Sequence, residues 1–396
     1  MNMNEQMKES EESILHTYNR FPVVFEKGQG CYLYDSEGKE YLDFAAGIAV
    51  NSLGYHYPGY DEALKDQIDK LMHISNLYYN EPIIEAGAKL VKASKMSKAF
   101  FTNSGTEAIE GALKAAKKYA YVRDGHADHE IIAMNHSFHG RSIGALSVTG
   151  TAHYREPFEP LMGGVKFADF NNLESVKAQI TDKTCAIITE VVQGEGGIYP
   201  AKKEFLEGLR QICDEKDIML IFDEIQCGMG RTGHYFAWQA YGVKPDIMTS
   251  AKALGCGVPV GAFVLGEKAA KASLEPGDHG TTYGGNPFVC AAVSKVFDIY
   301  ENDKIIEHVQ EMAPYLEQKL DEIVAKHECA ATRRGMGFMQ GIVIQGRPVG
   351  EVVKAALAKG LLVISAGSDV LRIVPPLVIT KEHIDKMAAI LDECME

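Results

Sequence analysis

The sequence reads MLIFDEIQCGMGRTG at residues 219–233 and PDIMTSAKALGCG at residues 245–257. The first segment begins with a short, continuous apolar run, which is typical of a strand buried on both faces. Asp223 follows that run, and open α/β sheets bind their ligands at the carboxyl ends of strands. The second segment has another short apolar run, followed by Lys252 among small residues. If both runs belong to one sheet, the acid and the lysine lie at the same edge.

Two interpretations fit Asp223 and Lys252 when this segment is considered alone. The first is an ordinary ion pair at the ends of two strands. The second is a reactive site, because a desolvated lysine near a buried carboxylate is suited to Schiff-base chemistry. The local sequence leaves both interpretations open.

Strands and helices alternate through the middle of the chain. Apolar runs predict strands, and apolar residues at helical spacing, such as Leu64 and Ile68, predict helices. This alternation favours an α/β fold in which a mainly parallel sheet has helices on both faces. The predicted strands are residues 100–102, 130–134, 182–189, 219–222, 246–249 and 261–266, and the predicted helices are residues 61–72, 82–93, 105–121 and 204–215.

The two ends of the chain predict a second, smaller α+β domain. Two strands around Gly38 are expected near the N-terminus, after a loose arm or isolated helix at residues 1–13. From residue 288 to the C-terminus we expect helical periodicity at 288–327, a strand at 333–345, a helix at 349–359, strands at 361–365 and 370–374, and a helix at 381–394. The predicted domains are 1–50 (arm and part of the small domain), 51–287 (large domain) and 288–396 (small domain).

The composition argues against several classes of partner. The chain has 396 residues, 46% of them hydrophobic, and a net charge of −14. Since nucleic acids and anionic membranes bind clustered basic charge, neither is an expected partner. The eight cysteines contain no C-x-x-C pair, and no apolar run reaches transmembrane length. We therefore expect a cytoplasmic protein with reduced thiols.

Two further patterns are not interpreted as functional sites. Residues 228–233 match the G-x-G-x-x-G pattern, but a dinucleotide-binding turn follows its strand directly and opens a long helix. Here residues 223–227 intervene, so a nicotinamide cofactor is not expected. The spacing of the histidines at positions 126, 129, 136 and 139 matches no zinc-binding pattern, so no metal site is predicted.

The segment Asn103-Ser-Gly-Thr-Glu107 precedes a predicted helix and has two possible roles. Ser104 and Glu107 have the S-x-x-E spacing of a capping box, which stabilises a helix start. A turn of small residues at a helix N-terminus also presents free N–H groups to a phosphate. The motif alone fits either role, and one turn can serve both.

Short motifs follow one another along the chain: SGTEA (104–108), FHGR (138–141), QGEGG (193–197), DEIQ (223–226), GRTG (230–233), KALG (252–255) and GTTYGGNP (280–287). Together they resemble the class III (ω-amino acid) aminotransferases, which use pyridoxal phosphate and have fold type I. The resemblance extends from about Tyr18 to the C-terminus. It implies a seven-stranded sheet in the large domain and a small domain built from both chain ends.

The resemblance also implies pyridoxal 5′-phosphate as the cofactor and roles for individual residues. Lys252 is expected to bind the cofactor covalently and, once released, to act as a base. Asp223 is expected to keep the pyridinium nitrogen protonated. Thr282 is expected to reach the phosphate of the neighbouring subunit, which implies a homodimer with shared active sites. The implied cofactor contacts are Ser104, Gly105, Thr106, Phe138, Asp223, Gln226, Lys252 and Thr282.

Within the class, the chain is most similar to members that transaminate N2-acetylornithine with 2-oxoglutarate in arginine biosynthesis. Arg141 is expected to bind the carboxylate of the acylated ornithine, and Arg372 the α-carboxylate of glutamate. Glu195 is expected to pair with Arg372 until glutamate displaces it. The implied substrate contacts are Arg141, Glu195, Thr281 and Arg372.

Other substrates and reactions stay open at this level. Succinylornithine, 4-aminobutyrate, ornithine and acyl-lysine donors are alternatives within the class. Ile48 lies near the position where ornithine aminotransferases have a tyrosine, and its apolar side chain favours an acylated donor or 4-aminobutyrate. A racemase or aminomutase would keep Lys252 and Asp223 without needing a Glu195–Arg372 switch. A non-enzymatic binding module is the remaining alternative.

Overall fold

A seven-stranded sheet forms the centre of the larger half of the molecule. The computed structural model describes residues 2–396. The order of the strands is β4-β12-β11-β10-β7-β5-β6, and only β12 runs antiparallel to its neighbours. The prediction of a mainly parallel seven-stranded sheet is therefore confirmed. Its strands are β4 (Lys98–Thr102), β5 (Glu130–Met134), β6 (Val165–Ala168), β7 (Thr184–Glu190), β10 (Met219–Asp223), β11 (Ile247–Ser250) and β12 (Gly261–Leu265).

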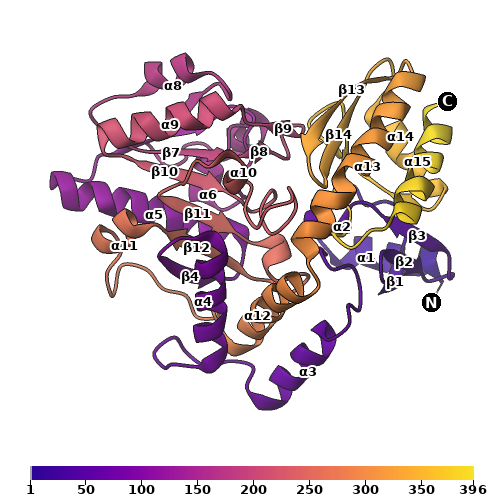
Figure 1. The fold of residues 1–396 in the computed structure, drawn as a ribbon, viewed down its shortest axis with the longest axis horizontal. Coiled ribbons are helices and arrows are strands. Elements are labelled where there is room, and N and C mark those ends of the chain that lie inside the picture. The colour runs from indigo at the N-terminus through magenta and orange to yellow at the C-terminus, as the bar shows by residue number, and fades with distance from the viewer. Residues whose placement is uncertain (1) are drawn as a thin grey trace.

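The central strand β10 is buried on both faces, as its continuous apolar run predicts. Successive side chains of a strand point to opposite faces. Met219 and Ile221 accordingly pack with α5 (Gly105–Asp124), whereas Leu220 and Phe222 pack in a second cluster with α9 (Lys203–Lys216). The α/β layering predicted from the sequence is thus present, with helices on both faces of the sheet (Figure 1).

Helix α5 approaches the sheet closely because small residues form its inner face. Its buried side chains are mainly alanines, and a Cβ atom at Gly111 would lie 2.2 Å from the Phe263 ring. The other helices of this half of the molecule are α3 (Tyr60–Lys70), α4 (Glu81–Ser94), α6 (Ile143–Ser147), α7 (Ala152–Arg155), α8 (Leu173–Gln179), α10 (Trp238–Tyr241), α11 (Glu267–Ala272) and α12 (Pro287–Asn302).

Two four-stranded sheets form the other half of the molecule. One has the order β13-β14-β17-β16, and the other has the order β1-β2-β3-β15. In the second sheet, β3 from the N-terminal region pairs in parallel with β15, so that Leu42 lies beside Leu361. Both chain ends therefore build this half, as predicted. The strands are β1 (Phe25–Gln29), β2 (Tyr32–Asp35), β3 (Glu40–Asp43), β13 (Ala330–Met336), β14 (Met339–Ile344), β15 (Leu361–Leu362), β16 (Ile364–Ala366) and β17 (Val370–Ile373).

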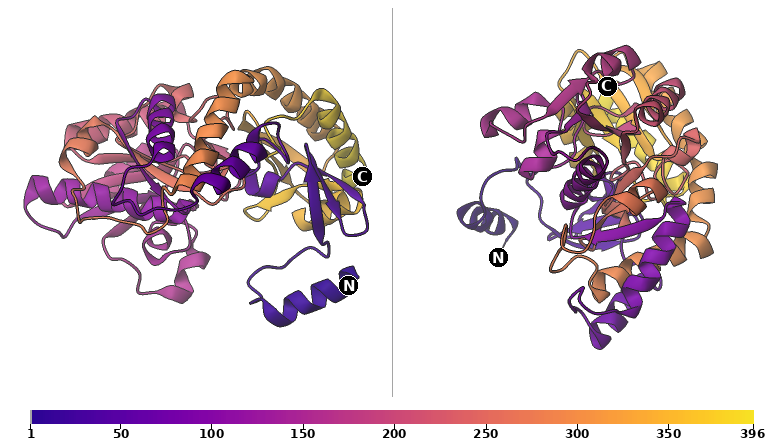
Figure 2. Two further views of the ribbon diagram at one scale, coloured as in Figure 1. Left: turned by 90° about the horizontal axis from the view of Figure 1, so that it is seen from below. Right: turned by 90° about the vertical axis from the view of Figure 1, so that its left-hand side faces the viewer.

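Helices α13 (Ile305–Lys326) and α14 (Val349–Ala358) pack with these two sheets, and α15 (Lys381–Met395) packs with α13 and α14 (Figure 1). The domain boundaries at residues 50 and 287 stay predictions. Helix α1 (Met3–Ser13) has no buried residue, which agrees with the expected isolated helix, and Figure 2 shows it away from the rest of the fold. No helix within residues 2–396 combines the length and apolarity needed to span a membrane.

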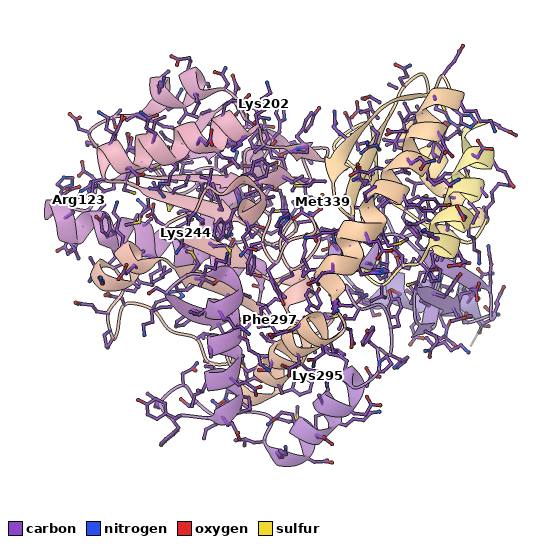
Figure 3. All side chains as sticks on the ribbon, viewed as in Figure 1. Arg123, Lys202, Lys244, Lys295, Phe297 and Met339 are labelled. Atoms are coloured by element: carbon purple, nitrogen blue, oxygen red, sulfur yellow. The ribbon has the colours of Figure 1, made fainter. Side chains whose placement is uncertain are left out.

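Two predictions for the C-terminal region are wrong in detail. Residues 333–345 form a hairpin rather than one strand, because Gly337 has a positive φ of 59° and turns the chain between β13 and β14. A Cβ atom there would lie 2.6 Å from the Arg231 carbonyl oxygen, so the turn packs tightly against the other half. In Figure 3, Met339, the first residue of β14, lies at the side of the smaller half that faces the larger half. Residues 361–365 are likewise divided between β15 and β16, which belong to different sheets.

A left-handed turn at residues 46–49 has no signature in the sequence. Ala46, Gly47, Ile48 and Ala49 have φ values of 48°, 63°, 65° and 62°. This conformation costs an L-residue roughly 1–2 kcal/mol, and it is least favourable for a β-branched side chain such as that of Ile48. The carboxylate of Asp43 accepts hydrogen bonds from the N–H groups of residues 45 and 46 and fixes the start of the turn. Such strained segments concentrate at functional sites.

Candidate active site

A cavity of about 430 Å³ opens at the carboxyl ends of the parallel strands. Lys252 and Asp223 both line it, together with residues 103–106 and 138–141. Asp223 ends β10, and Lys252 follows β11, so the neighbouring parallel strands bring the two residues to one edge. The sheet therefore assembles in space several motifs that lie far apart in the sequence.

Lys252 has the properties of a reactive amine. Its backbone has a φ of 48°, in the left-handed region that non-glycine residues rarely adopt. Burial lowers the pKa of its side chain to about 8, and the nearby Arg372 acts in the same direction, whereas Glu195 opposes it. A larger fraction of the amine is thus neutral and nucleophilic near pH 7 than for an exposed lysine.

Asp223 is held by three groups, and Lys252 is not one of them. The side chain accepts hydrogen bonds from the Ile225 N–H at 3.0 Å and the Thr249 hydroxyl at 3.1 Å, and its other oxygen lies 2.7 Å from His139 Nδ1. No ion pair joins Asp223 to Lys252 within residues 2–396. The simple interpretation of the two residues as a strand-end ion pair therefore does not describe the structure.

The Ser104 turn caps α5 and also borders the cavity. The Ser104 hydroxyl accepts a hydrogen bond from the Glu107 N–H at 3.3 Å, as in a capping box. The reciprocal contact differs, because Glu107 accepts from the N–H of Asn103, at 2.6 Å, instead of that of Ser104. The first N–H groups of a helix have no intrahelical acceptor, and those of Gly105 and Thr106 stand at the cavity wall. The turn can therefore cap the helix and bind an anion.

Phe138 and Arg141 form another part of the cavity wall. The Arg141 guanidinium lies 4.0 Å from the centre of the Tyr154 ring and 5.5 Å from that of Phe138. The side chain is exposed and has no acidic partner within the described chain. Aromatic faces attract the guanidinium electrostatically and limit its freedom, while its N–H groups stay available to a carboxylate.

Arg372 is in the opposite situation, because it is buried and paired. Its guanidinium donates hydrogen bonds to both carboxylate oxygens of Glu195, at 3.3 Å for Nη2, and to Gln226 Oε1 at 3.1 Å. Burial alone would raise the pKa of Glu195, but Arg372, Lys252 and Gln226 together outweigh burial and lower it, with Arg372 the largest contributor of the three. The structure thus brings Glu195, Gln226 and Arg372 together beside Lys252, and Gln226 contacts both charged groups.

Thr281 and Thr282 are not part of the Lys252 cavity. They line a separate hollow of about 380 Å³, which shares Asn103 with the Lys252 cavity. Thr281 Oγ1 accepts hydrogen bonds from Asn103 Nδ2 at 3.2 Å and from the Gly284 N–H at 3.1 Å. Thr282 is exposed. Of the expected contact residues, only these two threonines lie away from the Lys252 site within one chain.

Two residues of the cavity are not among the site residues predicted from the sequence. His139 contacts Asp223, and Glu190 ends β7 beside Asp223 with an almost fully buried side chain. Burial, and next the Asp223 carboxylate, raise the pKa of Glu190 well above its ordinary value. A signal for Glu190 was available, because it is an acidic residue that directly follows an apolar strand. His139 has no signal beyond its place next to Phe138.

A group of possible metal ligands lies far from this cavity. Asp124, His126 and His129 place one ligand atom each within 4.8 Å of the others. Asp124 is already held by the Arg123 guanidinium, at 2.6 and 2.5 Å, and by His129 Nε2 at 2.9 Å. Arg123 lies at the outer end of α5, remote from the smaller half of the molecule (Figure 3). The structure therefore gathers residues that the sequence spacing did not suggest, around a carboxylate already paired with arginine.

Comparisons with known proteins fit this arrangement of residues. Residues 14–395 match the model of the aminotransferase class-III family. The chain is 48% identical to the acetylornithine aminotransferase of Methanocaldococcus jannaschii, covering 96% of this chain and 95% of that one. It is 47% identical to that of Clostridium acetobutylicum, covering 98% and 100%. A solved ornithine aminotransferase of Toxoplasma gondii, described with partial occupancy of PLP at its active site, has a TM-score of 0.95 at 28% identity, covering 100% of this chain and 94% of that one.

Proposed function

Because this chain belongs to the class III aminotransferases, we propose that it transfers the δ-amino group of N2-acetyl-L-ornithine to 2-oxoglutarate. The products are N-acetyl-L-glutamate 5-semialdehyde and L-glutamate, as in arginine biosynthesis. The proposed cofactor is pyridoxal 5′-phosphate in the Lys252 cavity. The two relatives at 47% and 48% identity, both named acetylornithine aminotransferases, support this donor.

The residues of the cavity fit this cofactor. The N-terminus of the 20-residue helix α5 offers the N–H groups of Gly105 and Thr106 to a phosphate. Phe138 offers a ring face to a planar heterocycle, and Asp223 offers a carboxylate to a ring nitrogen. Lys252 supplies a partly neutral amine to an aldehyde. Each chemical feature of pyridoxal phosphate thus has a matching group in one cavity.

The protein residues divide the catalytic work. When bound, pyridoxal phosphate supplies the electron sink for proton removal from the amino donor. Lys252 is the base that moves this proton, because burial holds its amine near the pKa that proton transfer at neutral pH requires. Asp223 stabilises positive charge on the ring nitrogen, and His139 holds the Asp223 carboxylate in place. The Glu195–Arg372 pair lies next to Lys252 and responds to the substrate.

The Glu195–Arg372 contact is the observation that supports a two-substrate reaction most directly. An enzyme that alternates between an acylated ornithine and glutamate has to bind one carboxylate in one half-reaction and two in the other. Arg141 has no acidic partner among residues 2–396 and is available to the donor. Arg372 is neutralised by Glu195 and becomes available only when a carboxylate displaces that side chain. This arrangement favours glutamate as the second amino compound.

We also propose a cytoplasmic homodimer. Several apolar side chains of the α3–α4 region are exposed, among them Leu77 at 87% and Tyr79 at 95%, and exposed apolar groups of this size favour protein contacts. Such a dimer supplies Thr282 to the phosphate of the neighbouring subunit, because Thr282 lies outside the Lys252 cavity of its own chain. The eight cysteines are all free, which agrees with a reducing compartment.

Single-donor half-reactions test the proposed function. The protein is loaded with pyridoxal phosphate and mixed with one amino donor at a time: N2-acetylornithine, N2-succinylornithine, ornithine, 4-aminobutyrate or glutamate. The absorbance change to the pyridoxamine form measures each rate. We expect N2-acetylornithine and glutamate to react fastest. Faster reaction of 4-aminobutyrate or ornithine than of N2-acetylornithine contradicts the proposed donor, and a protein that does not bind the cofactor contradicts the whole proposal.

A further inference from the structure

Glu190 is the one acidic residue of the cavity wall that the proposed reaction does not use. It is the last residue of β7, its side chain is buried, and its carboxyl group lines the Lys252 cavity. One oxygen accepts a hydrogen bond from the Phe138 N–H at 3.2 Å, and the other accepts from the Gly194 N–H at 3.3 Å. Glu190 therefore joins the Phe138 loop to the Gly194 loop, which also meet where Gln193 Nε2 donates a hydrogen bond to the Asn135 carbonyl oxygen at 3.0 Å.

These two loops carry residues with different tasks. Phe138 precedes Arg141 on one loop, and both line the cavity. Gly194 directly precedes Glu195, which pairs with Arg372. Gly194 also packs tightly, because a Cβ atom there would lie 2.5 Å from the Gln226 side chain. A shift of the Glu190 carboxyl group would thus move Phe138 and Glu195 at the same time.

The position of Glu190 in the sheet determines its charge. Glu190 and Asp223 are partners in the register of the parallel strands β7 and β10, so their side chains point to the same face at the same level. Two carboxylates buried side by side on neighbouring strands repel each other, which favours retention of a proton by one of them. Asp223 has three hydrogen-bonding contacts, to His139 at 2.7 Å, the Ile225 N–H and the Thr249 hydroxyl, whereas Glu190 has two, so Glu190 is the candidate to carry the proton.

We propose that Glu190 is a positioning residue that carries a proton and couples the Phe138 loop to the Glu195 switch. A protonated carboxyl group still accepts hydrogen bonds from both backbone N–H groups, and it adds no second negative charge beside Asp223. Burial and the Asp223 charge, which raise the pKa of Glu190, agree with this assignment. The titratable groups that face it are Asp223 and Cys227 of the β10 end, His139, Glu195 and Lys252.

The charge of Glu190 can be measured apart from the activity. In the protein loaded with pyridoxal phosphate, absorbance follows the protonation of the cofactor-bound Lys252 as pH is varied. Removal of a nearby negative charge lowers the pH midpoint of this change. Glu195→Gln, which removes an ionised neighbour, is the matched control and should lower the midpoint by about one pH unit or less. Glu190→Gln should leave the midpoint unchanged.

Infrared spectroscopy provides an independent measurement. The difference between the wild-type and Glu190→Gln spectra should contain a protonated-carboxyl band at neutral pH, with and without cofactor. Glu224→Gln is a useful comparison, because Glu224 is also buried, with a pKa raised by burial to about 7, so its band should disappear as pH rises through 7. The Glu190 band should persist above that pH. Two results would overturn the assignment of a proton to Glu190. One is a carboxylate band for Glu190, and the other is a pH midpoint shift in Glu190→Gln equal to that in Glu195→Gln.

Half-reaction kinetics test the coupling of the two loops. Glu190→Gln retains one acceptor oxygen, so we expect both the N2-acetylornithine and the glutamate half-reactions to slow about three- to tenfold. Glu190→Ala loses both contacts and should slow both half-reactions further. Unchanged half-reactions in a folded Glu190→Ala protein overturn the positioning role. This kinetic test rests on the proposed function, but the spectra do not: if no donor reacts with the wild-type protein, the proposed function fails while the spectra still decide the proton on Glu190.

Discussion

The surroundings of Arg141 and of Arg372 differ in every respect that governs how a carboxylate binds. Arg141 is exposed, lies on the Tyr154 ring and has no acidic partner within residues 2–396. Arg372 is only 3% exposed and gives hydrogen bonds to both oxygens of Glu195. A carboxylate can bind Arg141 directly, whereas at Arg372 it has to displace an acidic side chain that is already in place.

This difference suits an enzyme with two unlike amino substrates. A permanently available Arg372 would attract the carboxylate of any donor and would pull an acylated ornithine out of line with Lys252. The proposed role of the Glu195 side chain is to prevent this, because its carboxylate pairs with the Arg372 guanidinium through both oxygens. In the proposed function, specificity thus depends on a removable acidic side chain, Glu195, as well as on attraction to the two arginines. The two regions can be tested separately by substitutions that affect one arginine and spare the other.

The largest expected effect concerns Lys252, which is expected to serve the Arg141 and Arg372 regions equally. Lys252→Ala removes the proposed base, and both half-reactions should fall about 1,000-fold or more, since the proposed nucleophile and proton carrier are lost together. The variant should still hold the cofactor non-covalently, without labelling by borohydride. Lys244→Ala, at an exposed lysine outside the cavity, serves as the control and should retain full activity. Appreciable turnover by Lys252→Ala would contradict the assigned role.

Arg372→Lys should separate the two half-reactions. A lysine cannot make the two parallel hydrogen bonds of a guanidinium, so glutamate loses much of its carboxylate site. Loss of a buried charge contact costs about 2–5 kcal/mol, and we expect the glutamate half-reaction to slow about 100-fold. The N2-acetylornithine half-reaction should change less than about fivefold, because the proposed carboxylate site for that donor is Arg141. Equal losses measured by stopped-flow absorbance would contradict separate carboxylate sites.

The pH dependence of cofactor loading should also distinguish the two regions. Burial lowers the pKa of Lys252 to about 8, and only its neutral amine attacks an aldehyde. The loading rate of the cofactor-free protein should therefore rise about tenfold per pH unit below pH 8 and level off above it. Glu195 raises the pKa of Lys252, so Glu195→Gln should move this profile to lower pH. Arg141→Lys should leave the pH profile unchanged. A shift of equal size in both variants would contradict the distinction between the Arg141 and Arg372 regions.

The sequence predicts most of the sheet and much of the cavity, because these features depend on local patterns. The run Met219–Phe222 is apolar at every position, and only a strand covered on both faces needs such a run. The acid and the lysine after the two strands then follow from parallel pairing. Ser104 and Glu107 define the start of α5 from four residues of sequence. In each case, the prediction depends on residues that are close together in the sequence.

The remaining features depend on contacts between distant residues. Glu190 acquires its properties from Asp223 on a neighbouring strand, and the sequence does not specify which strands are neighbours. The Gly337 turn is fixed by its packing on the Arg231 carbonyl group, more than 100 positions away in the chain. The left-handed turn at Ile48 opposes the local preference of its residues. Tertiary packing imposes all three. The sequence marks Glu190 as an acidic residue after an apolar run, but local patterns could not reveal its contact with Asp223, the Gly337 turn or the Ile48 turn.

Glu195→Gln should affect the Arg372 region by a smaller amount than loss of the arginine. Glutamine still accepts a hydrogen bond from Arg372, but without a charge it is displaced more readily by a carboxylate. We expect the KM for glutamate to fall about five- to tenfold, which corresponds to ~1 kcal/mol. The KM for N2-acetylornithine should rise slightly, since an unmasked Arg372 competes for its carboxylate. Equal impairment of both half-reactions would argue against a switch.

The smallest expected effect concerns the aromatic support of Arg141. The guanidinium lies 4.0 Å from the Tyr154 ring centre, and a cation–π contact at a site of this exposure contributes about 0.5–1 kcal/mol. Tyr154→Leu should therefore raise the KM for N2-acetylornithine about two- to fivefold and leave kcat nearly unchanged, because the arginine loses orientation but keeps its charge. Tyr154→Phe retains the ring and should behave like the wild type. If Phe and Leu at this position impair binding equally, the tyrosine hydroxyl rather than the ring supports Arg141, and the open carboxylate site owes its geometry to a hydrogen bond.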